Sequence, residues 1–254
     1  MNKNKLVMIS GATSGIGKAA AELFAKEGWN LFITGRRQER LDDLANILSI
    51  ENKVNVQALC FDIANRDELK KQIEKHHTQL QSLDLLINNA GLALGKSSFQ
   101  DGLDSDWETM IDTNIKGLIY LTKEVIPYFI KKKSGQIINV SSTAARDMYP
   151  GGNVYSATKS AVDALTKSLR LDLLEHNIKV SSIAPGMVNT EFSEVRFHGN
   201  KEQADKVYQG FEPLVAHDVA DAIYYIASRP AHVHIGDLLI TCTAQANSNV
   251  VFKS

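Results

Sequence analysis

The chain has 254 residues, of which 44% are hydrophobic and 22% are charged, and its formal net charge is -1. This composition is typical of a globular protein in water, and the near-zero charge gives no reason to expect nucleic acid or an anionic membrane as a partner. The N-terminal residues lack a secretory signal, and no apolar run is long enough to span a membrane. The two cysteines, Cys60 and Cys242, are far apart, which favours a reducing compartment. We therefore expect a cytoplasmic protein.

Short apolar runs alternate along the chain with longer amphipathic ones. The predicted strands are Leu6–Ile9, Asn30–Thr34, Val54–Phe61, Leu83–Ile87, Gln136–Val140, Val180–Ile183 and Asp237–Cys242. The predicted helices are Ile16–Glu27, Arg40–Leu48, Asp67–Thr78, Trp107–Ile130, Val154–His176 and Val219–Ala227. Apolar strands that alternate with helices favour a parallel sheet covered on both faces. We predict an α/β fold with one Rossmann-type, doubly wound parallel β-sheet and helices on both faces.

The domain organisation follows from the same pattern. The chain shows no internal repeat and no linker-like change of composition, so we predict one domain over residues 1–254. The least regular segment is Asn189–Leu214, which contains Gly199, Gly210 and many polar residues. We predict that residues 189–214 form an inserted, mobile cover over the substrate site.

A glycine-rich loop separates the first predicted strand from the first helix. Gly11, Gly15 and Gly17 follow the spacing G-x-x-x-G-x-G in SGATSGIG. Glycines allow a tight turn and a close approach of the backbone to a pyrophosphate, and the free N–H groups of the next helix face that anion. The alternative is a plain glycine-rich turn. The position between strand and helix favours a dinucleotide site, in which Thr13, Ser14 and Ile16 also take part.

Two adjacent arginines end the second predicted strand, in FITGRRQER. Arg37 stands twenty residues after Gly17, where a dinucleotide fold meets the adenosine ribose. An acidic residue at this place binds the ribose hydroxyls of NAD, whereas a guanidinium group can bind a 2′-phosphate through paired hydrogen bonds. Arg36 and Arg37 therefore predict NADP(H), and the alternative is a solvated basic turn.

A tyrosine and a lysine four residues apart lie on a predicted helix, in NVYSATKSAV. This spacing puts Tyr155 and Lys159 on one face. A nearby cation lowers the pKa of a tyrosine, which can then act as a general acid or base near neutral pH. Ser142 and the NNAG run of Asn88–Gly91 end other strands, and Asn114 lies inside a long helix, where it needs a buried partner. Strand-end residues gather at the carboxyl edge of the sheet, where ligands bind.

Together these motifs resemble the short-chain dehydrogenase/reductase family, with its order and spacing kept from residue 5 to about residue 245. The resemblance implies that Tyr155 exchanges the hydroxyl proton, while Ser142 orients the substrate oxygen. It also implies that Lys159 binds the nicotinamide ribose and lowers the pKa of Tyr155, and that Asn114 holds a water linked to Lys159. The further cofactor-binding residues that it implies are Asp62, Ile63, Asn89, Ala90, Gly91, Pro185, Gly186, Val188 and Thr190. For Asp62 the alternative is a helix cap, a role that Asn65 can fill better.

Longer stretches, among them NNAGLALG and TEFSEVRFHG, resemble the NADP-dependent 3-hydroxy acid dehydrogenases of that family. These enzymes oxidise the 3-hydroxyl group of serine, L-allo-threonine or 3-hydroxypropionate, or reduce the matching carbonyl. Such a substrate needs a cation for its carboxylate. We select Arg196, in the predicted cover, as the first candidate and Arg146 as the second. A surface or subunit salt bridge is the alternative role of Arg196.

Two other functions are compatible with parts of this pattern. A carbonyl reductase for a sugar, steroid or quinone-like substrate keeps the enzyme class, whereas a non-catalytic NADP-binding regulator does not. We predict no metal site, because His232 and His234 have no further ligands at suitable spacing. The resemblance implies a homotetramer, in which the polar residues after Ala244 reach a neighbouring subunit.

Overall fold

The computed structural model describes residues 5–253 of the chain. Its main sheet has seven strands in the order β3-β2-β1-β4-β5-β6-β9, and all adjacent pairs run parallel. The strands are β1 Leu6–Ser10, β2 Asn30–Gly35, β3 Val56–Cys60, β4 Leu83–Asn88, β5 Gly135–Val140, β6 Ile178–Pro185 and β9 Asp237–Ile240. Two short strands, β7 Val188–Asn189 and β8 Leu214–Val215, form a separate parallel pair. The prediction of a parallel sheet is confirmed.

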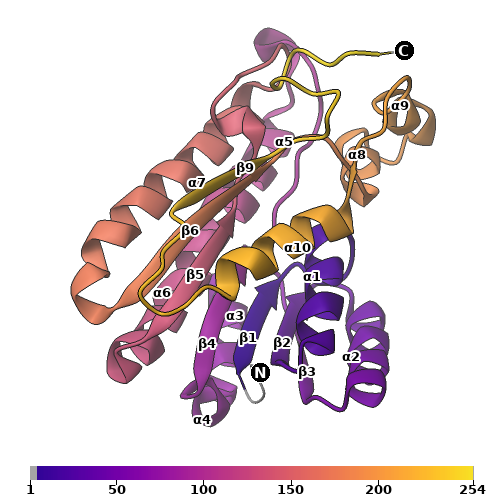
Figure 1. Ribbon diagram of the computed structural model, residues 1–254. Coiled ribbons are helices and arrows are strands. Elements are labelled where there is room, and N and C mark those ends of the chain that lie inside the picture. Colours follow the sequence, from indigo (N-terminus) through magenta and orange to yellow (C-terminus); the bar gives the residue numbers. More distant parts are fainter. Residues whose placement is uncertain (1–4, 254) are drawn as a thin grey trace.

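Helices cover both faces of this sheet (Figure 1). On one face lie α1 Gly15–Lys26, α2 Gln38–Asn52 and α10 Ala216–Ala227. On the other lie α3 Arg66–Lys75, α6 Leu118–Lys132 and α7 Asn153–Asp172. The remaining helices are α4 His77–Leu80, α5 Asp104–Ile111, α8 Glu191–Arg196 and α9 Lys201–Lys206. None of the helices between residues 5 and 253 is long and apolar enough to cross a membrane.

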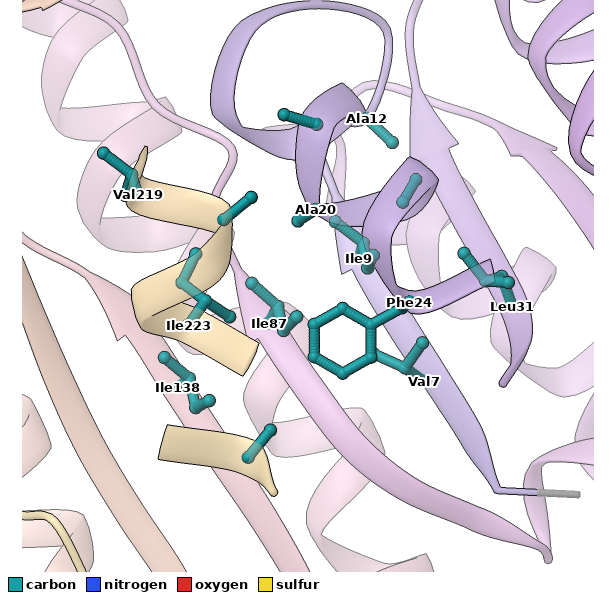
Figure 2. Close-up of a cluster of buried hydrophobic side chains, with 14 of the residues drawn as sticks. Val7, Ile9, Ala12, Ala20, Phe24, Leu31, Ile87, Ile138, Val219 and Ile223 are labelled. Carbon is teal, nitrogen blue, oxygen red and sulfur yellow. The ribbon is translucent and has the colours of Figure 1, made fainter. Parts of the chain in front are cut away.

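The strands are apolar throughout because each face of the sheet has its own core. Val7 and Ile9 of β1 point toward Phe24 of α1 and Ile223 of α10 (Figure 2). Their neighbours in β1, such as Met8, point the other way, into the cluster under α3 and α6. A strand buried on both faces gains hydrophobic stabilisation from every side chain, which explains the lack of polar alternation.

The strand order creates a crevice beside β1. The chain runs outward from β1 to β3 and then starts again at β4, on the opposite side of β1. The loops that follow β1 and β4 therefore diverge at the carboxyl edge of the sheet, and ligands bind at such a switch point.

Some element boundaries differ from the sequence-based ones. The long helix predicted over Trp107–Ile130 is a run from α5 to α6 that contains a π-helical turn, Asp112–Gly117. The helix predicted over Val154–His176 ends at Asp172, followed by a 3₁₀ turn, Leu174–His176. The segment predicted to be irregular, residues 189–214, contains α8 and α9, which lie beyond the carboxyl edge of the sheet (Figure 1).

Candidate active site

A cavity of about 430 Å³ opens at the carboxyl edge of the sheet. It is lined by the loops after β1 to β6, by α7 and by α8. The sequence-predicted residues that line it are Gly11, Thr13, Ser14, Gly15, Ile16, Arg36, Arg37, Asp62, Ile63, Asn89, Ala90, Gly91, Ser142, Tyr155, Lys159, Pro185, Gly186, Val188, Thr190 and Arg196. Gly17, Asn114 and Arg146 lie outside this lining.

The glycine loop lies tightly against the end of β4. Gly11 has a φ of +68°, and a Cβ there would lie 2.9 Å from the Cα of Ala90. A Cβ on Gly17 would lie 2.3 Å from the Gly11 carbonyl oxygen, so Gly17 permits close packing of α1 rather than lining the cavity. The Asn89 amide donates hydrogen bonds to the carbonyl oxygens of Ser10 and Gly11, at 3.0 and 3.1 Å. Asn89 therefore fixes the loop from beneath.

The predicted 2′-phosphate site has both arginines at its edge. Arg37 donates hydrogen bonds from Nη2 to Thr13 Oγ1 at 2.8 Å and to Ser14 Oγ at 2.9 Å, and from Nη1 to Glu191 at 3.0 Å. Arg36 pairs with Asp62, with 3.6 Å between Nη1 and Oδ2. This end of the cavity is exposed and rich in paired charges.

Asp62 does not cap α3. Its Oδ1 accepts a hydrogen bond from the backbone N–H of Ala64 at 2.9 Å. The N-cap of α3 is Asn65, whose Oδ1 accepts from the N–H of Glu68 at 3.2 Å. The Asp62 carboxylate thus lines the cavity beside Arg36.

The catalytic candidates lie at the opposite, buried end of the cavity. Tyr155 and Lys159 share the inner face of α7, and Ser142 follows β5. The Lys159 ammonium lies 6.0 Å from the centre of the Tyr155 ring and donates a hydrogen bond to the Val140 carbonyl oxygen at 2.9 Å. The i, i+4 spacing therefore brings the two side chains together, as predicted.

Burial controls the protonation of both groups. Burial raises the pKa of Tyr155 to about 12, and the charge of Arg196 and the hydrogen bond with Ser142 oppose this shift. Burial lowers the pKa of Lys159 to about 8, and the charge of Asp163 opposes that shift. The prediction of a lowered Tyr155 pKa, with Lys159 as the cause, is therefore wrong. Loss of water outweighs the nearby charges, and Arg196 is the main cation that acts on the tyrosine.

Asn114 positions the catalytic helix. It is 1% exposed and lies in the π-helical turn between α5 and α6. Its amide donates to the Leu92 carbonyl oxygen at 2.8 Å and to Thr158 Oγ1 at 3.1 Å, and its Oδ1 accepts from the Leu92 N–H at 2.9 Å. The predicted buried partners thus exist. Through these hydrogen bonds Asn114 links Leu92, in the loop after β4, to Thr158, the residue before Lys159.

Arg196 closes the catalytic end of the cavity from α8. Its guanidinium carbon lies 5.0 Å from the Tyr155 ring centre, 5.1 Å from that of Phe192 and 5.7 Å from that of Tyr149. Its buried Nε has no hydrogen-bond partner among residues 5–253. An unpaired buried donor is costly, so this N–H is available to an acceptor in the cavity.

Arg146 is placed elsewhere. It pairs with Asp237 and, at 3.7 Å, with Asp163, and it lines a second cavity behind α7 together with Arg170. The loop after β5 directs Ser142 into the main cavity and Arg146 away from it. The two acidic partners neutralise the charge of Arg146, so the structure does not place it where it could meet the substrate of Tyr155.

Several lining residues gave no signal in the sequence. They are Leu92, Lys96, Thr143, Tyr149, Glu191, Phe192, Tyr208, Gln245 and Ser248. Gln245 accepts a hydrogen bond from the N–H of Met187 at 2.8 Å, and Asn249 donates to the Met148 carbonyl oxygen at 2.8 Å. The C-terminal segment after Ala244 therefore makes hydrogen bonds within its own chain. Its polar, patternless sequence could not indicate these contacts.

The described part of the chain, residues 5–253, holds no group of three or more histidine, cysteine or acidic residues that could bind a metal ion.

A glycine loop at the switch point of a parallel sheet, joined by one cavity to a buried tyrosine and lysine, defines an oxidoreductase that binds a dinucleotide and acts on CH–OH groups. A family profile described as short chain dehydrogenase matches residues 5–201. The chain belongs to the short-chain dehydrogenase family.

Several relatives match this chain over most of its length. Serine 3-dehydrogenase of Agrobacterium fabrum is 44% identical over 232 residues, 91% of each chain. Sulfoacetaldehyde reductase 2 of Chromohalobacter salexigens is 43% identical over 242 residues, 95% of each chain. The NADP-dependent 3-hydroxy acid dehydrogenase of Escherichia coli is 41% identical over 234 residues, 92% of this chain and 93% of that one.

Solved structures agree with this assignment. The closed form of serine dehydrogenase complexed with NADP+ superimposes with a TM-score of 0.91 at 39% identity, over 98% of this chain and 99% of the other. Such relatives and the arginine pair of this chain support NADP(H) as its cofactor.

Proposed function

We propose that the protein is an NADP(H)-dependent oxidoreductase of small 3-hydroxy acids, such as serine, L-allo-threonine or 3-hydroxypropionate. It oxidises their 3-hydroxyl group or reduces the matching carbonyl. The observation that carries this substrate class is the buried, unpaired Nε of Arg196 beside Tyr155.

The chain offers a fitting site for the cofactor. The glycine loop has no room for a Cβ at Gly11, and the cavity runs without interruption from Arg37 to Tyr155. The loop after β1 would hold the pyrophosphate, Arg36 and Arg37 the 2′-phosphate, and Lys159 the nicotinamide ribose. When bound, NADP(H) supplies or accepts the hydride at its nicotinamide ring.

Tyr155 handles the proton. With a pKa of about 12 its hydroxyl is protonated at neutral pH, so it can donate a hydrogen bond and then a proton to a carbonyl oxygen during reduction. In the oxidative direction it must take up that proton as an anion, which Arg196 and the hydrogen bond with Ser142 stabilise. Ser142 also orients the substrate oxygen.

Arg196 binds the acid group of the substrate. Serine, 3-hydroxy acids and sulfoacetaldehyde, which appear in the names of the relatives, all carry an anionic group one carbon away from the reacting carbon. A guanidinium group 5.0 Å from the Tyr155 ring is close enough to hold such an anion while the reacting oxygen meets the tyrosine hydroxyl.

Substitution of Arg196 tests this role. We expect Arg196→Ala to raise KM by about 10-fold or more for serine and 3-hydroxypropionate, because a charge-assisted hydrogen bond contributes about 1.5–3 kcal/mol. The KM of uncharged alcohols should change far less. Arg196→Lys, which keeps the charge, is the matched control and should recover part of the loss. Equal effects of Arg196→Ala on acids and alcohols would show that the arginine only packs against the rings.

Assembly and location complete the proposal. We propose a cytoplasmic homotetramer of single-domain subunits in which residues 189–214 cover the substrate. Exposed apolar side chains on α5 to α7 and the turns around them support subunit pairing through these helices: Leu103, Ile111, Ile119, Leu171 and Leu174. Light scattering after gel filtration should give four times the subunit mass, and a monomer mass would contradict this assembly.

A further inference from the structure

Glu191 is a lining residue with no part in the chemistry above. It is the first residue of α8, directly after Thr190, and thus stands where the chain enters the 189–214 segment. Its Oε2 accepts a hydrogen bond from Arg37 Nη1 at 3.0 Å, and its Oε1 accepts one from Arg40 Nη1 at 2.8 Å. One carboxylate therefore spans two arginines at the predicted 2′-phosphate site.

Most N–H donors of the Arg37 guanidinium group already have acceptors within the protein. Its Nε and Nη2 donate three hydrogen bonds to the hydroxyls of Thr13 and Ser14, and its Nη1 donates one to Glu191. A guanidinium group has five N–H donors, so at most one is left uncommitted within residues 5–253. Paired binding of a phosphate needs two parallel donors. At least one present acceptor must therefore give way, and Glu191 is the only one of them that is charged.

The charge balance leads to the same residue. Arg36, Arg37 and Arg40 face the carboxylates of Asp62 and Glu191, so three positive charges meet two negative ones. A phosphate monoester brings nearly two negative charges at neutral pH. Burial pushes the pKa of the Glu191 carboxyl upward, yet the hydrogen bonds and charges of Arg37 and Arg40 bring it below its ordinary value. Glu191 is therefore an anion at neutral pH and repels the phosphate.

We propose that Glu191 competes with the 2′-phosphate of the cofactor for Arg37 and thereby limits how strongly the protein prefers NADP(H) to NAD(H). Arg40 keeps its own bond to the carboxylate when Arg37 turns to the phosphate. Because Glu191 begins α8, and Arg196 ends the same helix, this exchange also links the adenosine end of the cavity to the segment that carries the substrate cation. The inference rests on the NADP(H) part of the proposed function and not on the substrate.

The experiment uses the full chain and two small probes. Calorimetry measures the affinity of 2′,5′-ADP, which carries the 2′-phosphate, and of 5′-AMP, which does not. Glu191→Gln keeps the size of the side chain and removes its charge. We expect this variant to bind 2′,5′-ADP about 2- to 5-fold more tightly than the wild type, the scale of exposed charge pairs, with 5′-AMP unchanged.

Two further variants isolate the cause. Glu194→Gln removes the same charge from the same helix but leaves the arginine pairs in place, so it should bind both probes like the wild type. In an Arg37→Ala background, Glu191→Gln should improve 2′,5′-ADP binding clearly less than in the wild type, because only the charge repulsion between Glu191 and the phosphate is then relieved and no hydrogen bond of Arg37 is released. Independent effects of the two substitutions would overturn the proposal.

The remaining outcomes are also decisive. Unchanged or weaker 2′,5′-ADP binding by Glu191→Gln would mean that the carboxylate positions Arg37 rather than competing for it, and the inference alone would fail. A wild type that binds 2′,5′-ADP no better than 5′-AMP would overturn both this inference and the NADP(H) assignment. Both binding measurements are made without turnover, so they would hold even if the hydroxy-acid substrate were assigned wrongly.

Discussion

The two ends of the cavity handle charge by different means. At the catalytic end Tyr155 and Lys159 are 8% and 5% exposed. Burial raises the pKa of Tyr155 and lowers that of Lys159, so in both cases it favours the uncharged form. At the adenosine end the side chains of Arg37 and Glu191 are 41% and 43% exposed, and their charges are balanced by direct pairing. One cavity therefore has a buried end and an end that is exposed to solvent.

This difference predicts how each end responds to substitution. Buried groups act through large desolvation energies and are held by fixed neighbours, so their loss should be costly and specific to the chemical step. Exposed pairs are screened by water, so their loss should be modest and should affect ligand selectivity instead.

The largest effect is expected at Tyr155. Tyr155→Phe removes the hydroxyl that exchanges the proton and keeps the ring under Arg196. We expect kcat to fall by about 10³-fold, within the usual range for loss of a general acid or base, while NADP+ affinity changes only a few-fold. Steady-state kinetics and a binding titration measure both. Retained turnover would remove Tyr155 from the mechanism.

The next effect concerns Lys159 and pH. The pKa of Lys159 is lowered from 10.5 to about 8, so below pH 8 the folded protein buries a charged ammonium group. Between pH 8 and 10.5 the folded state has lost this proton and the unfolded state has not, and the free energy of unfolding therefore rises with pH. The rise amounts to about 3 kcal/mol and ends above 10.5.

Lys159→Met lacks this titration and should lack the rise. From pH 7 to pH 10.5 the wild type should therefore gain about 3 kcal/mol of unfolding free energy relative to the variant. The lost hydrogen bond to Val140 adds an offset that does not depend on pH. Urea unfolding at a series of pH values provides the test. Parallel curves would mean that Lys159 is not desolvated.

The smallest of these effects belongs to the exposed end. Replacing Arg36 and Arg37 together by serine should weaken NADP+ binding by about 30-fold, from about 2 kcal/mol of charge-assisted hydrogen bonding, with little change for NAD+. The ratio of the two dissociation constants is the quantity to measure. If the affinities for NADP+ and NAD+ fell by comparable factors, the two arginines would be surface charges that do not recognise the 2′-phosphate.

The fold was predictable because its signals are local. Apolar strands alternating with amphipathic helices indicated the sheet, and the glycine loop and the strand-end residues indicated its carboxyl edge. The helix spacing of Tyr155 and Lys159 was likewise local. Element bounds were less accurate, since a π-helical turn such as Asp112–Gly117 keeps a helical pattern in the sequence.

The parts that could not be predicted depend on distant contacts. Arg37 and Glu191 are 154 residues apart, and no spacing rule joins them. Arg146 was selected for its charge, but its acidic partner Asp237 lies 91 residues further along the chain. The direction of the Tyr155 pKa shift also depended on burial, which outweighs the neighbouring charges and can be known only from packing.

We propose above that the protein transfers hydride between NADP(H) and small anionic hydroxy acids. Initial rates of NADPH formation, followed by absorbance, test it directly on serine, L-allo-threonine and 3-hydroxypropionate, with 1-propanol and a bulky secondary alcohol as uncharged comparisons. We expect kcat/KM values at least about 10-fold higher for the acids, because one charge-assisted hydrogen bond contributes about 1.5–3 kcal/mol. Equal or higher values for the uncharged alcohols would contradict it.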